Sequence, residues 1–315
     1  MQIPKSHKIP IPTFPHPPFP LAQTGLSHYN KQMEYRILKD IHSRADLKGL
    51  SFTELDLLAD DLREYIIDTV SKTGGHLAPN LGIIELTLAL LKVHDPVKNR
   101  IVWDVGHQCY PYKIITGRRD SFCTVRTHGG ISGFPKRSEN PADHFGTGHA
   151  STSISAAVGF AAARDLKDED HNVIAVIGDG ALTGGMAFEG LNNAGSLQSE
   201  ILVVLNDNNM SISPNVGALS RYLTNIIANP TYTKLKTNAW NLLGKMSLGT
   251  QLRSIAGKVE DSLKNLIVPG MLFEQLGFEY YGPIDGHNIE EMVTVLRELK
   301  GIKKPKLLHV ITEKG

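Results

Sequence analysis

The chain has 315 residues, with 33 lysines and arginines against 32 aspartates and glutamates, so its formal charge is only +1. This balance excludes a general electrostatic attraction to nucleic acid or to an anionic membrane surface. The two cysteines, Cys109 and Cys123, are too few for a disulfide framework and lack the spacing of a zinc site. The longest apolar runs are about strand length, far shorter than the ~20 residues of a membrane span. We therefore expect a soluble protein in a reducing compartment, the cytoplasm.

The first twenty residues hold seven of the seventeen prolines. Proline lacks a backbone donor and favours an extended polyproline conformation over helix or sheet. Residues 1–30 are therefore predicted to form a proline-rich arm. This segment has neither the continuous apolar stretch of a secretory signal nor the arginine and serine content of a transit peptide.

The following part of the chain predicts an α/β fold. From Phe52 to Val70, apolar residues recur at steps of three and four, which predicts a helix. Further on, short apolar runs at 101–103, 173–177, 201–205 and 307–311 alternate with helix-length segments at 151–166, 185–194 and 289–299. Strands that are apolar along their whole length are typical of a parallel sheet with helices on both faces.

Residues 209–270 interrupt this alternation, because they mix polar and apolar residues with several glycines and prolines. We expect short helices in a mobile excursion from a single domain that spans residues 31–315. The sequence contains no repeat of solenoid period.

Polar triplets follow two consecutive predicted strands. Gly178-Asp179-Gly180 ends the run at 173–177, and Asn206-Asp207-Asn208 ends the run at 201–205. Because ligands bind beyond the carboxyl ends of parallel strands, Asp179 and Asn208 are predicted to share one edge, about 5 Å apart if the strands are neighbours. One carboxylate and one amide oxygen suit Mg²⁺ that also binds a diphosphate. Each triplet alone is equally compatible with a tight turn.

The segment after Gly180 is predicted to open a helix, whose free backbone N–H groups can face the same diphosphate. Other nucleotide-binding and hydrolytic motifs are missing from the sequence: there is no P-loop, no Gly-x-Ser-x-Gly and no His-Glu-x-x-His. The spacing from Gly178 to Gly184 is one residue longer than the dinucleotide fingerprint, which leaves nicotinamide binding as a remote alternative.

Four histidines directly follow a glycine. They are His76, His107, His149 and His287. Glycine allows close approach to a ligand, and imidazole can donate to phosphate or move a proton near neutral pH. The pairs at 106–107 and 148–149 follow strand-like runs at 101–105 and 143–147, so they are predicted to face one cleft. For five histidines we expect only a hydrogen-bonded turn or core position: His94, His128, His171, His287 and His309.

Six longer motifs, in this order, resemble the 1-deoxy-D-xylulose-5-phosphate synthase family. They are Ser-Lys-Thr-Gly-Gly-His-Leu at 71–77, Trp-Asp-Val-Gly-His-Gln-Cys-Tyr-Pro at 103–111, Thr-Gly-Arg-Arg-Asp at 116–120, Gly-His-Ala-Ser-Thr-Ser at 148–153, Asn-Asp-Asn-Asn-Met-Ser-Ile-Ser at 206–213 and Gly-Pro-Ile-Asp-Gly-His at 282–287. The resemblance runs from about residue 45 to the last residue. Transketolase and pyruvate dehydrogenase E1 share only the general metal motif.

The resemblance implies a thiamine diphosphate-binding fold, with thiamine diphosphate and Mg²⁺ as cofactors. The family condenses pyruvate with D-glyceraldehyde 3-phosphate, releases CO₂ and forms 1-deoxy-D-xylulose 5-phosphate for isoprenoid, thiamine and pyridoxal biosynthesis. The cofactor carries the carbanion chemistry, and the protein orients the reactants and moves protons. The family's habit also implies a homodimer.

Site residues follow from the same resemblance. Asp179, Asn208 and the backbone carbonyl of Met210 are expected to bind Mg²⁺. The residues expected to line the cofactor are His107, Gly148, His149, Ala150, Gly180, Ala181 and Asn208. His76 is the candidate for proton transfer or hydrogen bonding at the reacting carbonyl, and Lys314 lies in a segment that resembles the family's Lys-Gly run near the cofactor.

The family pattern continues beyond Gly315 with a pyrimidine-binding domain and a C-terminal domain, which this sequence does not contain. Without that half, near-attack geometry at the cofactor's reactive carbon is incomplete. We therefore expect the chain alone to be inactive and the missing half to be its partner. Two alternatives stay open: a module that binds thiamine diphosphate and Mg²⁺ without turnover, and the N-terminal half of another transketolase-like enzyme.

Overall fold

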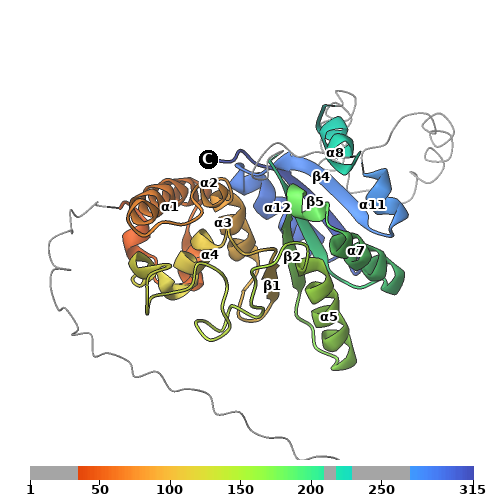
Figure 1. Cartoon of the computed structure of the whole chain (residues 1–315), viewed down its shortest axis with the longest axis horizontal. Coiled ribbons are helices and arrows are strands. Elements are labelled where there is room, and N and C mark those ends of the chain that lie inside the picture. The colour runs from red at the N-terminus through yellow and green to blue at the C-terminus, as the bar shows by residue number, and fades with distance from the viewer. Residues whose placement is uncertain (1–34, 209–217, 229–269) are drawn as a thin grey trace, which may run out of the picture. The chain divides into compact units, whose positions relative to one another are not determined.

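A parallel sheet of five strands forms the centre of the computed structural model, which describes residues 35–208, 218–228 and 270–315 (Figure 1). The strands are β1 (Arg100–Trp103), β2 (Val173–Gly178), β3 (Leu202–Asp207), β4 (Glu279–Asp285) and β5 (Lys306–Ile311). Their order across the sheet is β1-β2-β3-β5-β4. The predicted arm at 1–30, Met210 and most of the predicted excursion lie outside the described residues.

Helices cover both faces of the sheet (Figure 1). The apolar cluster on one face includes residues of α1 (Phe52–Thr73), α3 (Ile84–Val93), α4 (Tyr110–Lys113) and α12 (Ile289–Leu299). The other face packs against α5 (Ser153–Leu166), α7 (Gly185–Leu197), α8 (Ala218–Ala228) and α11 (Met271–Gln275). The remaining helices are α2 (Ala78–Leu81), α6 (Asp179–Leu182), the 3-10 turns Leu38–Asp40, Arg44–Gly49 and Phe122–Thr124, and the π turn Ile114–Arg118.

Local sequence explains where the main helices begin. Ser51 and Glu54 form a capping box at the start of α1, with the Glu54 carboxylate accepting the Ser51 amide at 2.7 Å. The Asn288 side chain caps α12 by accepting the Glu291 amide at 3.0 Å. These caps fix the start of two amphipathic helices: α12 packs against the sheet and α3, and α1 packs against α3 and α12.

The structure confirms the α/β fold with a parallel sheet, since all four sequence-predicted strands are present and buried. The strand-like run at 143–147 is wrong as a strand: these residues form a loop whose Asp143 binds Arg118. The sequence does not predict strand β4, because the interior of this strand carries Gly282 and Pro283. The register of β4 with β5 shifts between Tyr281 and Ile284. Proline is tolerated there because β4 is an edge strand. Among the described helices, none combines the length and the apolar character that crossing a membrane requires.

Candidate functional site

The carboxyl ends of the parallel strands converge on one edge of the sheet. In the register of the sheet, Gly178 of β2 lies beside Asn206 of β3, and Asp207 lies beside Ile311 of β5. The next residues along each strand, among them Asp179 and Asn208, therefore leave the sheet at the same edge. The strands β2 and β3 are neighbours, which is the condition on which the expected separation of Asp179 and Asn208 depends.

Asp179 lies against Asp207 at this edge. The two carboxyl groups share a hydrogen bond, and burial followed by the charge of Asp207 raises the pKa of Asp179 to about 7. Both residues are almost fully buried. Two close buried carboxyl groups are unfavourable when both are ionised, so this pair favours a bound cation. Asn208 follows directly and is half-buried.

Asp207 is held from the opposite side by His309 of β5. The Nε2 atom of His309 lies 3.0 Å from the Asp207 carboxylate, and its Nδ1 lies 2.8 Å from the Tyr280 hydroxyl of β4. His309 and Asp207 are fully buried. The sequence analysis expects only a hydrogen-bonded turn or core position for His309. The feature that indicates a larger role is its place as the one polar residue in the apolar run 307–311.

A second group of side chains surrounds His76 and His107. Their ring centroids lie 5.5 Å apart, and the Phe134 ring lies 5.9 Å from His76. Burial, and then the charges of His76 and Lys314, lowers the pKa of His107 to about 4; burial and Arg126 lower that of His76. Both imidazoles are therefore neutral near pH 7, when each carries one N–H donor and one acceptor nitrogen.

Asn80 joins the two histidine loops, although the sequence analysis did not single it out. Its Nδ2 donates to the backbone carbonyls of His76 (2.5 Å) and His107 (2.8 Å), and its Oδ1 accepts the Tyr110 amide at 2.8 Å. Asn80 is fully buried. A buried amide with all these partners fixes the spacing of His76 and His107.

The loop that carries Gly148, His149 and Ala150 is exposed and closes on the end of β1. Asp104, which follows β1, accepts the amides of Ser151 and Ser153 through its two carboxylate oxygens. A Cβ on Gly106 would lie 2.1 Å from the Thr147 Oγ1, so only glycine permits this approach. The two Gly-His loops are thus adjacent, and only the first follows a strand.

Ser151 connects the same loop to α6, where Gly180 and Ala181 lie. Its Oγ donates to the Ala181 carbonyl at 2.7 Å. The sequence predicts a helix that starts after Gly180. In the structure the short helix α6 already starts at Asp179, and α7 follows from Gly185.

The chain leaves β5 through Thr312, Glu313 and Lys314 and passes the His107 loop. Its backbone lies close to Gly82, where a Cβ would come within 2.5 Å of the Glu313 carbonyl oxygen and 3.2 Å of the Lys314 Cα. The Lys314 charge is close enough to lower the pKa of His107. The structure therefore brings Lys314 to the histidine group.

The donor chemistry of the edge fits a magnesium-bound diphosphate. Carboxylate and amide oxygens at Asp179 and Asn208 are hard ligands. Within residues 35–208, 218–228 and 270–315, no three histidine, cysteine or acidic side chains form a metal-binding group. The Nδ1 atoms of His76 and His107 are buried and have no hydrogen-bond partner in the described part of the chain, so a bound polar group can satisfy them.

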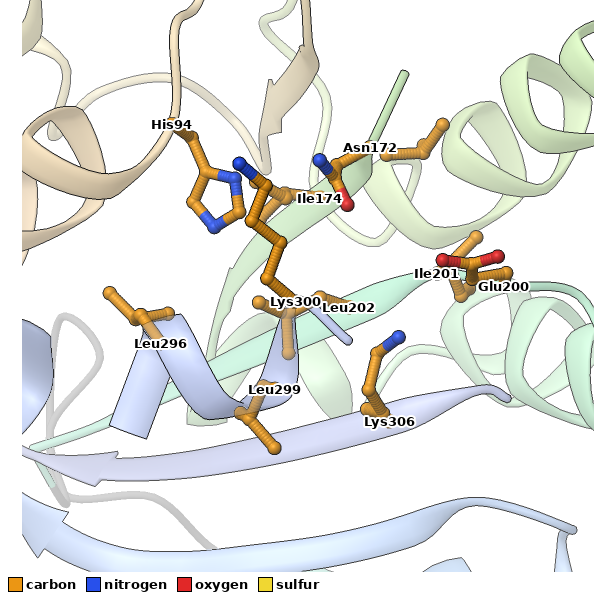
Figure 2. Close-up of a pocket in the computed structure, with 11 residues that line it drawn as sticks. His94, Asn172, Ile174, Glu200, Ile201, Leu202, Leu296, Leu299, Lys300 and Lys306 are labelled. Carbon is orange, nitrogen blue, oxygen red and sulfur yellow. The ribbon is translucent and has the colours of Figure 1, made fainter. Parts of the chain in front are cut away.

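The opposite edge of the sheet holds a separate cavity of about 10 Å³, the size of one water molecule. Figure 2 shows the Lys300 ammonium group beside the His94 ring there, with Asn172 and Lys306 also lining the space. The cavity lies at the amino ends of β2, β3 and β5, and it is too small for an organic cofactor. It is therefore not part of the candidate site.

Residues 38–312 match a family model described as 1-deoxy-D-xylulose-5-phosphate synthase. The chain belongs to this family. The synthase of Pelotomaculum thermopropionicum is 56% identical over 281 residues, and that of Caldanaerobacter subterraneus subsp. tengcongensis is 55% identical over 280 residues. Each match covers 89% of this chain but only 44% and 45% of the respective synthase. The chain thus spans less than half the length of these relatives.

The fold is also that of known transketolases. The crystal structure of the Campylobacter jejuni transketolase aligns with a TM-score of 0.60 at 22% sequence identity, over 84% of this chain and 38% of that one. At this identity the likeness establishes the fold alone. It agrees with the thiamine diphosphate-binding fold that the synthase resemblance implied.

Proposed function

We propose that this chain is the N-terminal, diphosphate-binding part of a 1-deoxy-D-xylulose-5-phosphate synthase. The full reaction condenses pyruvate with D-glyceraldehyde 3-phosphate, with loss of CO₂. The observation that supports the proposal is that His107, Asp179 and Asn208 follow the carboxyl ends of the neighbouring strands β1, β2 and β3, with the His76 ring 5.5 Å from that of His107.

Each residue group has a distinct role in this proposal. Asp179, Asn208 and the Met210 carbonyl bind Mg²⁺, which neutralises the diphosphate. Thiamine diphosphate supplies the carbanion chemistry when bound. The residues that line it are His107, Gly148, His149, Ala150, Gly180, Ala181 and Asn208.

His76 is proposed to hold or move a proton at the reacting carbonyl. Burial keeps its imidazole neutral near pH 7, so one ring nitrogen donates a hydrogen bond while the other accepts one. Phe134 packs against the ring and limits its rotation. Lys314 adds a positive charge beside His107, which favours the anionic end of the cofactor.

We propose that the complete active site also uses the part of the relatives' length that this chain does not span, in a cytoplasmic homodimer. A module that binds thiamine diphosphate and Mg²⁺ without turnover is the second candidate. The two candidates differ in whether they support turnover, because catalysis requires all reacting groups in place.

Calorimetry with thiamine diphosphate, with and without Mg²⁺, tests the site. We expect Mg²⁺-dependent binding that is lost in Asp179→Ala and retained in Asp170→Ala, since the Asp170 side chain is 87% exposed. Unchanged affinity in Asp179→Ala would refute the metal assignment.

Complementation tests the activity. The chain is mixed with the separately expressed remaining part of the Pelotomaculum relative, and pyruvate-dependent CO₂ release is measured. Release that depends on His76 supports the synthase; cofactor binding without any release favours the binding module.

A further inference from the structure

His287, which the sequence analysis placed only in a hydrogen-bonded turn, contacts two distant parts of the chain. Its Nδ1 lies 3.1 Å from the Glu85 carboxylate of α3, and its Nε2 accepts the backbone amide of Glu313 at 2.9 Å. Its own amide donates to Asp285 at 2.8 Å, which fixes the turn. His287 thus bridges α3 and the segment that follows β5.

These contacts define the protonation state of the ring. The Glu313 N–H is a donor, so Nε2 must be an unprotonated acceptor. The ring proton then lies on Nδ1 and points at Glu85, whose other carboxylate oxygen binds Arg63 at 2.5 Å. Glu85 is nearly fully buried and ion-paired, so it holds the ring in this tautomer.

The segment held by this contact, residues 312–315, is also packed on both of its flanks. Thr312 donates to the Asn206 side chain at 2.7 Å. Glu313 and Lys314 lie against Gly82, and Gly315 lies against Leu81. The hydrogen bond from Glu313 to His287 is the polar contact between these two anchors, immediately before Lys314.

We propose that His287 is a positioning residue that ties segment 312–315 to α3 and so holds Lys314 beside His107. The effect of the Lys314 position on cofactor binding rests on the proposed function. The tie itself is a property of this chain and can be tested without cofactor.

The tie is expected to open on acidification. An imidazolium carries N–H on both nitrogens, so its Nε2 would face the Glu313 N–H as a second donor. The Glu85 hydrogen bond is the main cause that raises the pKa of His287 above its ordinary value; burial opposes it, and the charges of Glu85, Asp285 and Glu313 add to it. Asp56 and Glu290 line the same surface pocket as His287, and Arg63 pairs with Glu85.

Two NMR measurements on the cofactor-free chain test the tie. The first is the scalar coupling between the Glu313 amide nitrogen and His287 Nε2, which exists only across a hydrogen bond. The second is the protection factor of the Glu313 amide against solvent exchange, between pH 8.5 and 5.5. In the wild type we expect a coupling at pH 8.5 that disappears with acidification, together with an about tenfold loss of protection.

Three variants separate the tie from general stability. His287→Ala removes the acceptor and should lose the protection at every pH. His287→Gln keeps an acceptor that does not titrate, so its protection should be independent of pH. His128→Ala changes an exposed histidine and should match the wild type.

Equal protection of Glu313 in His287→Ala and the wild type would overturn the proposal, and so would the same pH profile in His287→Gln and the wild type. Calorimetry then tests the consequence: thiamine diphosphate should bind His287→Ala about tenfold more weakly than the wild type, and Lys314→Ala should show a similar loss. A wild type that binds no thiamine diphosphate would refute the proposed function and leave the NMR result intact.

Discussion

The Asp104 carboxylate accepts the Ser151 amide at 2.7 Å, although 47 positions separate the two residues in the chain. Ser151 has a φ of 69°, a left-handed conformation that is uncommon for a residue with a side chain. The second Asp104 oxygen accepts the Ser153 amide at 3.0 Å, at the first turn of α5. A single buried carboxylate therefore holds the exposed 148–150 loop against the end of β1.

Replacing Asp104 by Asn should loosen this loop. The amide of Asn keeps one acceptor and places an NH₂ group against a backbone N–H, so one buried donor loses its partner, at a cost of about 2 kcal/mol. We expect Asp104→Asn to lower the free energy of unfolding by this amount and to weaken thiamine diphosphate binding, with the Gly148 and Ala150 amides exchanging faster. Urea unfolding and calorimetry measure the two effects. Asp170→Asn is the matched surface control, and equal effects in both variants would contradict the role of Asp104.

The sequence predicted the sheet and its binding edge because strand burial and strand endings are local patterns. Four buried strands carry apolar runs, interrupted only by His309 in the last, and polar triplets with Asp179 and Asn208 end two of them. Parallel neighbours then place both triplets at one edge, whatever the details of side-chain packing.

The residues that hold the site in place could not be predicted in the same way. Asn80, Asp104 and His309 each act through partners at least 27 positions away in sequence, apart from the local His76 contact of Asn80. A polar residue in a buried element shows only that a partner must exist. Its identity depends on the tertiary register.

Asp179 is expected to destabilise the metal-free chain. Its pKa of about 7 in the folded chain, raised by burial and by Asp207, lies above the ordinary value near 3.9. Folding therefore costs free energy once the unfolded chain is ionised, and this cost grows as the pH rises from 4 to 7. At pH 8, Asp179→Asn should therefore unfold at a higher urea concentration than the wild type. Its free energy of unfolding should be larger by about 2 kcal/mol, after allowance for the proton shared with Asp207.

The gain in the free energy of unfolding of Asp179→Asn should shrink as the pH falls toward 4, because the wild-type carboxyl group becomes protonated in the folded and in the unfolded chain. Mg²⁺ with thiamine diphosphate should stabilise the wild type and leave the variant unchanged. A variant that is less stable than the wild type at pH 8 without metal would show that the Asp179 and Asp207 pair is not strained.

His94 provides a pH dependence that is independent of the candidate site. Burial, and then the nearby charges of Lys300, Arg44 and Lys306, lowers its pKa to about 4. Between pH 6.5 and 4 the unfolded chain binds a proton that the folded chain does not, so stability falls as the pH falls through this window. The full loss for a shift of this size is about 3 kcal/mol.

The test compares urea unfolding of the wild type and of His94→Gln at pH 7.5 and 4.5. The variant keeps a polar side chain that does not titrate, so it should lose about 2 to 3 kcal/mol less than the wild type between the two values. The carboxyl groups are the same in both proteins, so their contributions to the pH dependence of stability cancel in the comparison. His107, whose pKa is also lowered to about 4, contributes to both, so the difference between the curves reports His94 alone. Parallel curves would mean that the His94 ring is protonated inside the fold, with Asn172 or a solvent molecule in the adjoining cavity satisfying its charge.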